Sequence, residues 1–287
     1  MSVLFEPAKI GNFEIRNRFM RSATYYALSD EGRFIGDESV NLMKTLAASG
    51  IGLLVTGYAY VSKHGQVFPD MNGIDSDGHI PHYTRMTNAV HDNGGRIVMQ
   101  IVHGGSESRN AARGDGKYLA VSVTDPLVNK KRPPVEMADE DIEEIIDAFG
   151  KAGRRVQEAG FDGVQIHGAH GYLVSQFLSP RSNRRQDRWG GSLENRARFL
   201  VEVVRSIKRH VDTDFPVMIK LGCRDYLSDG GGLTNDEGAE VAKMIAEEGI
   251  CHIEVSHGIK ERTAGASPDQ EAYMLPDAKA VRGKTSV

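Results

Sequence analysis

The sequence has little cysteine and no long apolar stretch. Only two cysteines, Cys223 and Cys251, occur among its 287 residues, and both lie inside apolar runs. Their spacing does not suit a zinc or an iron–sulfur site, so we expect buried thiols without a chemical role. No run approaches the ~20 apolar residues that a membrane-spanning helix needs, and residues 1–19 lack the apolar core of a signal peptide. These absences predict a soluble, cytoplasmic protein.

An excess of basic charge is also missing. The net charge is −4 and the pI is about 6.2, with no basic stripe along the chain, which predicts no binding to nucleic acid. A local cluster of arginines at 181–188 is expected to be a solvated loop or a subunit contact in a homo-oligomer. Hydrophobic residues make up 40% of the chain, enough for a full core.

Short apolar runs recur along the chain and are continuous rather than alternating, as expected for parallel strands that are covered on both faces. We predict strands at Arg18–Ala23, Gly52–Thr56, Ile97–Val102, Gly163–His167, Val217–Leu221 and His252–Ser256. Amphipathic helices are predicted between them at Asp141–Val156, at Ser192–Val211, and from the capping box at Thr234–Glu237 to Gly249. This alternation indicates βαβ units and a parallel sheet.

The choice between an open sheet and a barrel depends on a missing motif. A dinucleotide-binding open sheet carries G-x-G-x-x-G after an early strand, and here Thr24 and a Tyr-Tyr pair follow the first strand. Instead, polar side chains recur at the ends of several strands, which is typical of the (β/α)8 barrel. They are Thr24, Gln100, His103, His167, His170, Lys220 and His257. We therefore predict one (β/α)8 TIM-barrel domain over residues 1–287, truncated after about six strands and lacking strands 7 and 8.

The segment at 163–196 is the most informative of the sequence. A buried strand ends in His167, His170 and Tyr172, and a polar loop then leads to Ser192, a candidate helix N-cap. Two imidazoles and a phenol at a strand end can hold a carbonyl oxygen and deliver a proton beside it. The same H-x-x-H spacing also suits two zinc ligands, for which His103, Asp225, Glu254 or His257 would have to supply a third. We favour the first interpretation and expect no metal.

Five stretches together resemble the Old Yellow Enzyme family, in particular its NADH:flavin oxidoreductase and 2,4-dienoyl-CoA reductase-like branch. They are LFEPAKIGNFEIRNRF (4–19), MQIVHGG (99–105), HGAHGY (167–172), SPRSNRRQDRWGGSLENR (179–196) and MIKLGCRDY (218–226). The resemblance extends from Leu4 to about Val287 and implies a (β/α)8 barrel that holds FMN at the carboxyl ends of its strands.

Carried over position by position, the resemblance implies the roles of two groups of residues. Ala23, Thr24, Gln100 and Lys220 would bind FMN, with Gln100 on the pyrimidine side of the ring and Lys220 near N1 and O2. His167 and His170 would hold the substrate carbonyl, Tyr172 would supply the proton, and Tyr26 would line the substrate side. Part of the family has cysteine where Thr24 stands, so different tuning of the flavin is expected.

The implied activity is reduction of FMN by NADH or NADPH, followed by reduction of an activated alkene such as an enone or enoyl thioester. Two alternatives stay open. The chain is the barrel part of a larger iron–sulfur flavoprotein in one of them, and a truncated, non-catalytic binding module in the other, because barrels of this kind often build their phosphate site after strands seven and eight.

Overall fold

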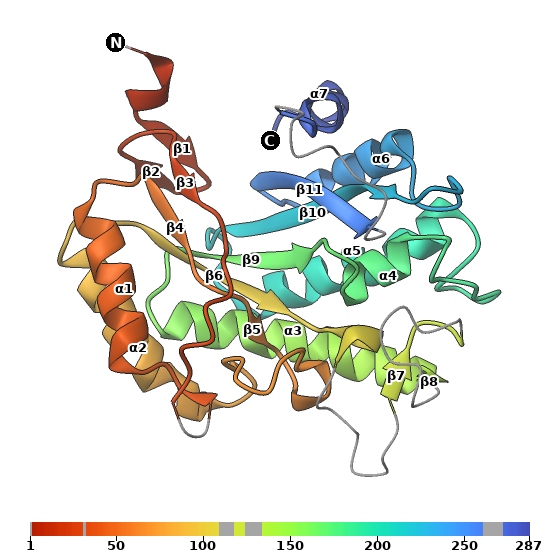
Figure 1. The fold of residues 1–287 in the computed structure, drawn as a ribbon, viewed down its shortest axis with the longest axis horizontal. Helices are drawn as coiled ribbons and strands as arrows, with labels where there is room; N and C mark the ends of the chain where they lie inside the picture. Colours follow the sequence, from red (N-terminus) through yellow and green to blue (C-terminus); the bar gives the residue numbers. More distant parts are fainter. Residues whose placement is uncertain (1, 31–32, 109–117, 124–133, 261–271) are drawn as a thin grey trace.

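A single curved sheet of parallel strands forms the centre of the molecule in the computed structural model (Figure 1). Its strand order is β11-β10-β9-β6-β4-β3, and β5 pairs with the last two residues of β6. The strands are β3 (Met20–Arg21), β4 (Leu53–Val55), β5 (Ala59–Tyr60), β6 (Ile97–Val102), β9 (Gly163–Gly168), β10 (Val217–Tyr226) and β11 (His252–Lys260). The structure describes residues 2–30, 33–108, 118–123, 134–260 and 272–287.

The sheet confirms the predicted barrel class. Its strands form an open arc of an α/β barrel, and no pairing joins β3 to β11 within the described ranges. All six residues of β6 and all six of β9 are buried. This burial on both faces explains the apolar run of β6, whereas β9 also buries Gln165 and His167. The predicted bounds of β6 match, whereas β10 and β11 extend beyond Leu221 and Ser256.

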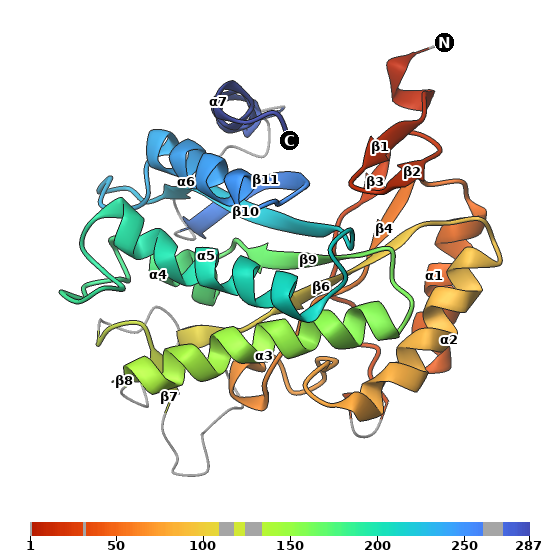
Figure 2. The same cartoon turned by 180° about the vertical axis from the view of Figure 1, so that it is seen from behind.

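Helices cover the outer face of the arc, as Figure 2 shows from behind. They are α1 (Asp37–Ala48), α2 (Ile80–His91), α3 (Asp139–Glu158), α5 (Leu193–His210), α6 (Asn235–Glu247) and α7 (Leu275–Lys284), with a short α4 (Leu173–Leu178) directly after β9. The predicted caps are confirmed: Ser192 accepts a hydrogen bond from the Asn195 N–H, and Thr234 and Glu237 form the capping box of α6. None of the helices in the described part of the chain is long and apolar enough to span a membrane.

An antiparallel hairpin lies at the amino ends of the strands, opposite the candidate site. Its strands β1 (Ala8–Ile10) and β2 (Phe13–Ile15) were not predicted. Ile10, Phe13 and Ile15 pack against Leu53, Val98 and Met218 at the beginnings of β4, β6 and β10. The hairpin therefore covers the amino ends of the strands with apolar side chains and leaves their carboxyl ends for chemistry.

The remaining short elements precede β1 or lie in the connections between the longer elements. They are η1 (Val3–Phe5), η3 (Lys63–Gly65), η4 (Asp77–His79), η5 (Gly105–Glu107) and the paired strands β7 (Tyr118–Ala120) and β8 (Pro134–Glu136). Of the two cysteines, Cys223 is buried on β10, where burial raises its thiol pKa to about 12, and Cys251 is partly buried just before β11.

Candidate functional site

The turn between β9 and α4 carries the three residues that the sequence singles out. His167 is the penultimate residue of β9, and Tyr172 immediately precedes α4. Between them the backbone takes two successive left-handed residues, with φ +62° at His170 and +76° at Gly171. The turn is fixed at both sides, because the His170 N–H donates to the His257 carbonyl on β11 and the Leu173 N–H donates to the His103 carbonyl after β6.

The turn brings the three side chains together around His167. The ring centroid of His167 lies 5.0 Å from that of His170 and 4.9 Å from that of Tyr172, both edge to face. His257 adds a third imidazole, with its centroid 4.6 Å from that of His170. The strand end therefore presents a cluster of polar rings.

Both predicted imidazoles are uncharged near neutral pH. The pKa of His167 lies well below its usual value, because burial disfavours the charged ring and the Lys220 ammonium adds positive charge nearby. The pKa of His170 is lowered for the same main reason, although part of its ring faces solvent. Neutral imidazole offers one donor and one acceptor, so these rings can donate hydrogen bonds to a carbonyl without bringing a charge.

The hydrogen bonds indicate which ring nitrogens donate. Nδ1 of His167 accepts from the Ala169 N–H at 3.3 Å, which leaves the proton of this neutral ring on Nε2. Nε2 of His170 lies 2.8 Å from the Ser256 hydroxyl. When that hydroxyl donates, Nδ1 of His170 carries the proton. His167 therefore presents a fixed donor, and Ser256 sets the donor of His170.

Tyr172 belongs to an aromatic wall that sequence reasoning did not find. Its hydroxyl lies 3.3 Å from the hydroxyl of Tyr58, and the Tyr58 ring stacks on Tyr25, with 5.6 Å between centroids. Tyr25 in turn stacks on Phe68. Tyr58 follows β4 in a segment with no predicted element, so its only signal was its place after a strand end.

Tyr26 lies on the other side of the chain from this wall. It packs against the main core and beside Gly57, and it is Tyr25 that contacts the wall of Tyr58 and Tyr172. The role of Tyr26 at the substrate stays a prediction.

The four residues expected to bind FMN lie on or directly after three strands, and they belong to one network of polar side chains or lie next to it. Gln100 is 1% exposed on β6, and Lys220 is 9% exposed on β10. Ala23 and Thr24 follow β3, directly after Ser22, whose hydroxyl accepts a hydrogen bond from the Lys220 ammonium at 2.7 Å. Thr24 is exposed, and its hydroxyl donates to the Ser22 carbonyl.

Two further residues connect this group, and neither was predicted to act at a flavin. Gln165 on β9 accepts from the Gln100 amide at 2.7 Å and donates to the Glu254 carboxylate at 3.0 Å. Glu254 on β11 also pairs with Lys220 at 3.0 Å. The available signal was a glutamine between Val164 and Ile166 and a glutamate inside an apolar strand, since polar residues in fully buried strands need partners.

The residues fit a flavin by their chemistry. The pyrimidine side of a flavin ring carries an N–H between two carbonyls, and an amide such as that of Gln100 both accepts and donates. Reduced flavin gathers negative charge near N1 and O2, which the Lys220 ammonium would stabilise. A zinc site does not fit as well, because Glu254 is paired with Lys220, and no group of three His, Cys, Asp or Glu suited to a metal occurs in the described part of the chain.

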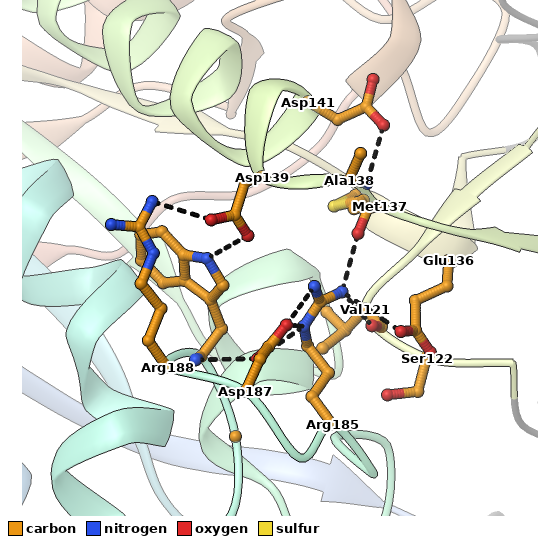
Figure 3. A network of polar contacts seen from close by, with 12 residues as sticks. Val121, Ser122, Glu136, Met137, Ala138, Asp139, Asp141, Arg185, Asp187 and Arg188 are labelled. Atoms are coloured by element: carbon orange, nitrogen blue, oxygen red, sulfur yellow. Dashed lines mark hydrogen bonds and ion pairs between the residues drawn. The ribbon is translucent and has the colours of Figure 1, made fainter.

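The arginine loop that follows α4 is not simply solvated, which corrects that expectation. Arg185 is only 6% exposed and donates to the carbonyls of Val121 and Met137 and to the carboxylate of Asp187 (Figure 3). Arg188, on the outer side of the same loop, pairs with Asp139. The buried guanidinium therefore ties the loop after the candidate site to the segments that flank β7 and β8.

Comparison with known proteins identifies the family of the chain. The model of the NADH:flavin oxidoreductase / NADH oxidase family matches residues 3–285. The chain is 33% identical over 279 residues to a metal reductase of Desulforamulus reducens, covering 96% of this chain and 41% of that protein. It is 35% identical over 289 residues to an NADPH dehydrogenase of Geobacillus sp., covering 100% of this chain and 81% of that protein.

Solved structures give the same result. A 2-naphthoyl-CoA reductase in complex with 2-naphthoyl-CoA superposes with a TM-score of 0.90 at 29% identity, over 98% of this chain and 44% of the reductase. An Old Yellow Enzyme from Pichia sp. superposes with a TM-score of 0.79 at 25% identity, over 88% of this chain and 70% of that enzyme. The chain thus spans less than half of some relatives and most of others. It belongs to the NADH:flavin oxidoreductase / NADH oxidase family and has the fold of the Old Yellow Enzymes.

Proposed function

We propose that the protein is an FMN-dependent NAD(P)H oxidoreductase that reduces the double bond of an activated alkene. The observation that carries this proposal is the convergence of His167, His170 and Tyr172 at one strand end, with both histidines uncharged. Family membership supports an oxidoreductase that uses a flavin, and the names of two similar proteins, 2-naphthoyl-CoA reductase and the NADH:acrylate oxidoreductase of Vibrio harveyi, support an activated substrate.

FMN would be held by Gln100, Lys220 and the backbone at Ala23 and Thr24. When bound and reduced by NADH or NADPH, it supplies the hydride for the β-carbon of the alkene. The protein's own residues would polarise the substrate and manage the proton.

His167 and His170 would donate hydrogen bonds to the substrate carbonyl. Negative charge develops on that oxygen during the reaction, and donors that are already oriented stabilise it without reorganisation. The fixed Nε2–H of His167 meets this requirement, since its other nitrogen is occupied by the backbone. Uncharged rings would give the same donors across the neutral pH range.

Tyr172 would protonate the α-carbon as general acid. Its ring packs edge to face on His167, so the phenol lies beside the proposed carbonyl site, and the Tyr58 hydroxyl can hold it in place. General-acid catalysis of this kind typically contributes about 10²–10⁴-fold.

The direct test is to denature the purified protein and analyse the supernatant for flavin, with reconstitution by added FMN. We expect FMN to be released without covalent attachment and the reconstituted protein to oxidise NADH or NADPH with an enone as acceptor. A protein that neither releases nor takes up flavin would refute the proposal, and flavin binding without enone turnover would refute the substrate class alone.

Gel filtration of the same preparation tests the expected homo-oligomer.

A second candidate is that this flavin barrel works within a larger oxidoreductase. The coverage of two relatives favours it, since the chain matches 41% of the metal reductase and 39% of an NADH oxidase of Thermoanaerobacter brockii. The mass of the protein isolated from its native source tests this: about the mass of the present chain would refute it.

A further inference from the structure

A continuous polar chain runs across the inside of the arc, from β11 to β6 and from β11 to β3. On one branch Glu254 binds Gln165, and Gln165 binds Gln100. On the other branch Glu254 binds Lys220 and Ser22, and Ser22 also binds Lys220. Among these contacts, only Glu254 belongs to both branches. It therefore connects Gln100 and Lys220, the two side chains that would contact a flavin.

The first branch fixes the direction of its hydrogen bonds. A carboxylate only accepts, so the Gln165 amide must direct its NH2 toward Glu254, at 3.0 Å. The Gln165 carbonyl is then directed toward Gln100 and accepts from the Gln100 amide nitrogen at 2.7 Å. The reverse orientation of Gln100 would bring two carbonyl oxygens together. Gln100 is thereby left with its carbonyl oxygen and one N–H for a ligand.

The second branch sets the charge near Lys220. Its ammonium lies 3.0 Å from the Glu254 carboxylate, and both side chains are nearly buried, with 11% and 14% exposed. Charges at this depth are screened less than on the surface. The Ser22 hydroxyl donates to Glu254 at 2.6 Å while it accepts from Lys220 at 2.7 Å, which holds the pair in place.

We propose that Glu254 is a positioning residue that orients the Gln100 amide toward the flavin and partly neutralises the Lys220 cation beside it. This inference rests on the proposed function. Under this proposal, Glu254 affects whether the protein binds oxidised or reduced flavin more tightly. Its carboxylate weakens the positive field of Lys220, which favours reduced flavin.

The charge effect is tested with Glu254→Gln, which keeps the shape and removes the charge. We expect the ratio of Kd for reduced to oxidised FMN to fall about tenfold, which corresponds to a two-electron midpoint potential about 30 mV more positive. Glu240→Gln is the matched control, since Glu240 pairs with Lys284 on the surface of α6, and it should leave the ratio unchanged.

The orientation effect is tested with Gln165→Leu, which breaks the relay and leaves the Glu254–Lys220 pair. The probe is 3-methyl-FMN, which lacks the pyrimidine N–H. We expect wild type to bind FMN more tightly than the analogue and Gln165→Leu to lose about tenfold of that preference, the value of one hydrogen bond. Thermal melting of each apoprotein establishes that the variants fold.

The outcomes separate the two proposals. If the wild-type protein binds no FMN, the proposed function and this inference both fail. If it binds FMN and Glu254→Gln leaves the midpoint potential unchanged or lowers it, the charge role is overturned while the proposed function stands. If Gln165→Leu discriminates between FMN and its analogue as wild type does, the orientation role is overturned.

Discussion

Replacing both His167 and His170 by alanine removes the two uncharged donors of the candidate site. The magnitude follows from the hydrogen bonds: His167 has one free donor, Nε2–H, because Nδ1 accepts from Ala169, and His170 has one donor set by Ser256. Loss of one oriented donor typically costs about 10²–10³ in turnover. We therefore expect each single variant to lose about 10²–10³-fold. Residues that act as a unit are not additive, so the loss in the double variant should exceed either single loss but stay below their product.

Stopped-flow kinetics of the two half-reactions is the appropriate assay. Flavin reduction by NADPH or NADH, and turnover with ferricyanide as an artificial acceptor, should stay close to wild type, because neither needs a carbonyl clamp. Reoxidation by an enone such as 2-cyclohexenone should slow. His91→Ala is the control, since His91 lies on α2 and pairs with Asp162. Unchanged enone turnover in the double variant would refute the assignment, and inactivation by a chelator would favour the zinc alternative.

Three further predictions concern the proton, the arginine loop and acid stability. Tyr172→Phe should slow enone reoxidation about 10²–10⁴-fold with little change in flavin reduction, and Tyr58→Phe should have a much smaller effect; equal traces for wild type and Tyr172→Phe would place the proton donor elsewhere. Arg185→Met should lower the free energy of unfolding by at least about 2 kcal/mol in urea titrations, whereas the half-exposed Arg188→Met should cost less than about 1 kcal/mol; similar losses would contradict the structural role of Arg185. Burial lowers the pKa of His103 to about 3, so as pH falls below about 6.5 the unfolded chain binds a proton at this ring before the folded protein does, and stability is lost. His103→Asn should therefore reduce the slope of unfolding free energy against pH by about 1.4 kcal/mol per pH unit between about pH 6 and 4. An unchanged slope would show that His103 does not contribute.

The sequence was sufficient to predict the strands with the strongest apolar runs. β6 and β9 are buried on both faces, so each position needs an apolar or internally paired side chain, and their bounds are readable. Weakly apolar elements were not predicted. The hairpin at Ala8–Ile15 depends on a tertiary contact with the amino ends of the strands, and α4 is too short to show a helical period.

The site was predictable where residues cluster along the chain and not where the fold gathers them. His167, His170 and Tyr172 lie within one turn, and their convergence follows from local geometry. Glu254 and Ser22 are more than 200 residues apart in the chain and meet only because the sheet curls. Arg185 is similar, since nothing in an arginine-rich loop distinguishes the one guanidinium that is buried.

The left-handed backbone at His170 sets stability against activity. A residue with a β-carbon is strained at φ +62°, whereas glycine adopts this angle without strain. Selection for thermal stability alone would therefore favour glycine at this position, with a gain of about 1 kcal/mol. The same exchange would remove an imidazole from the candidate site. Variants stabilised in this way should unfold later and turn over more slowly, so a screen that measures only melting temperature would enrich inactive protein.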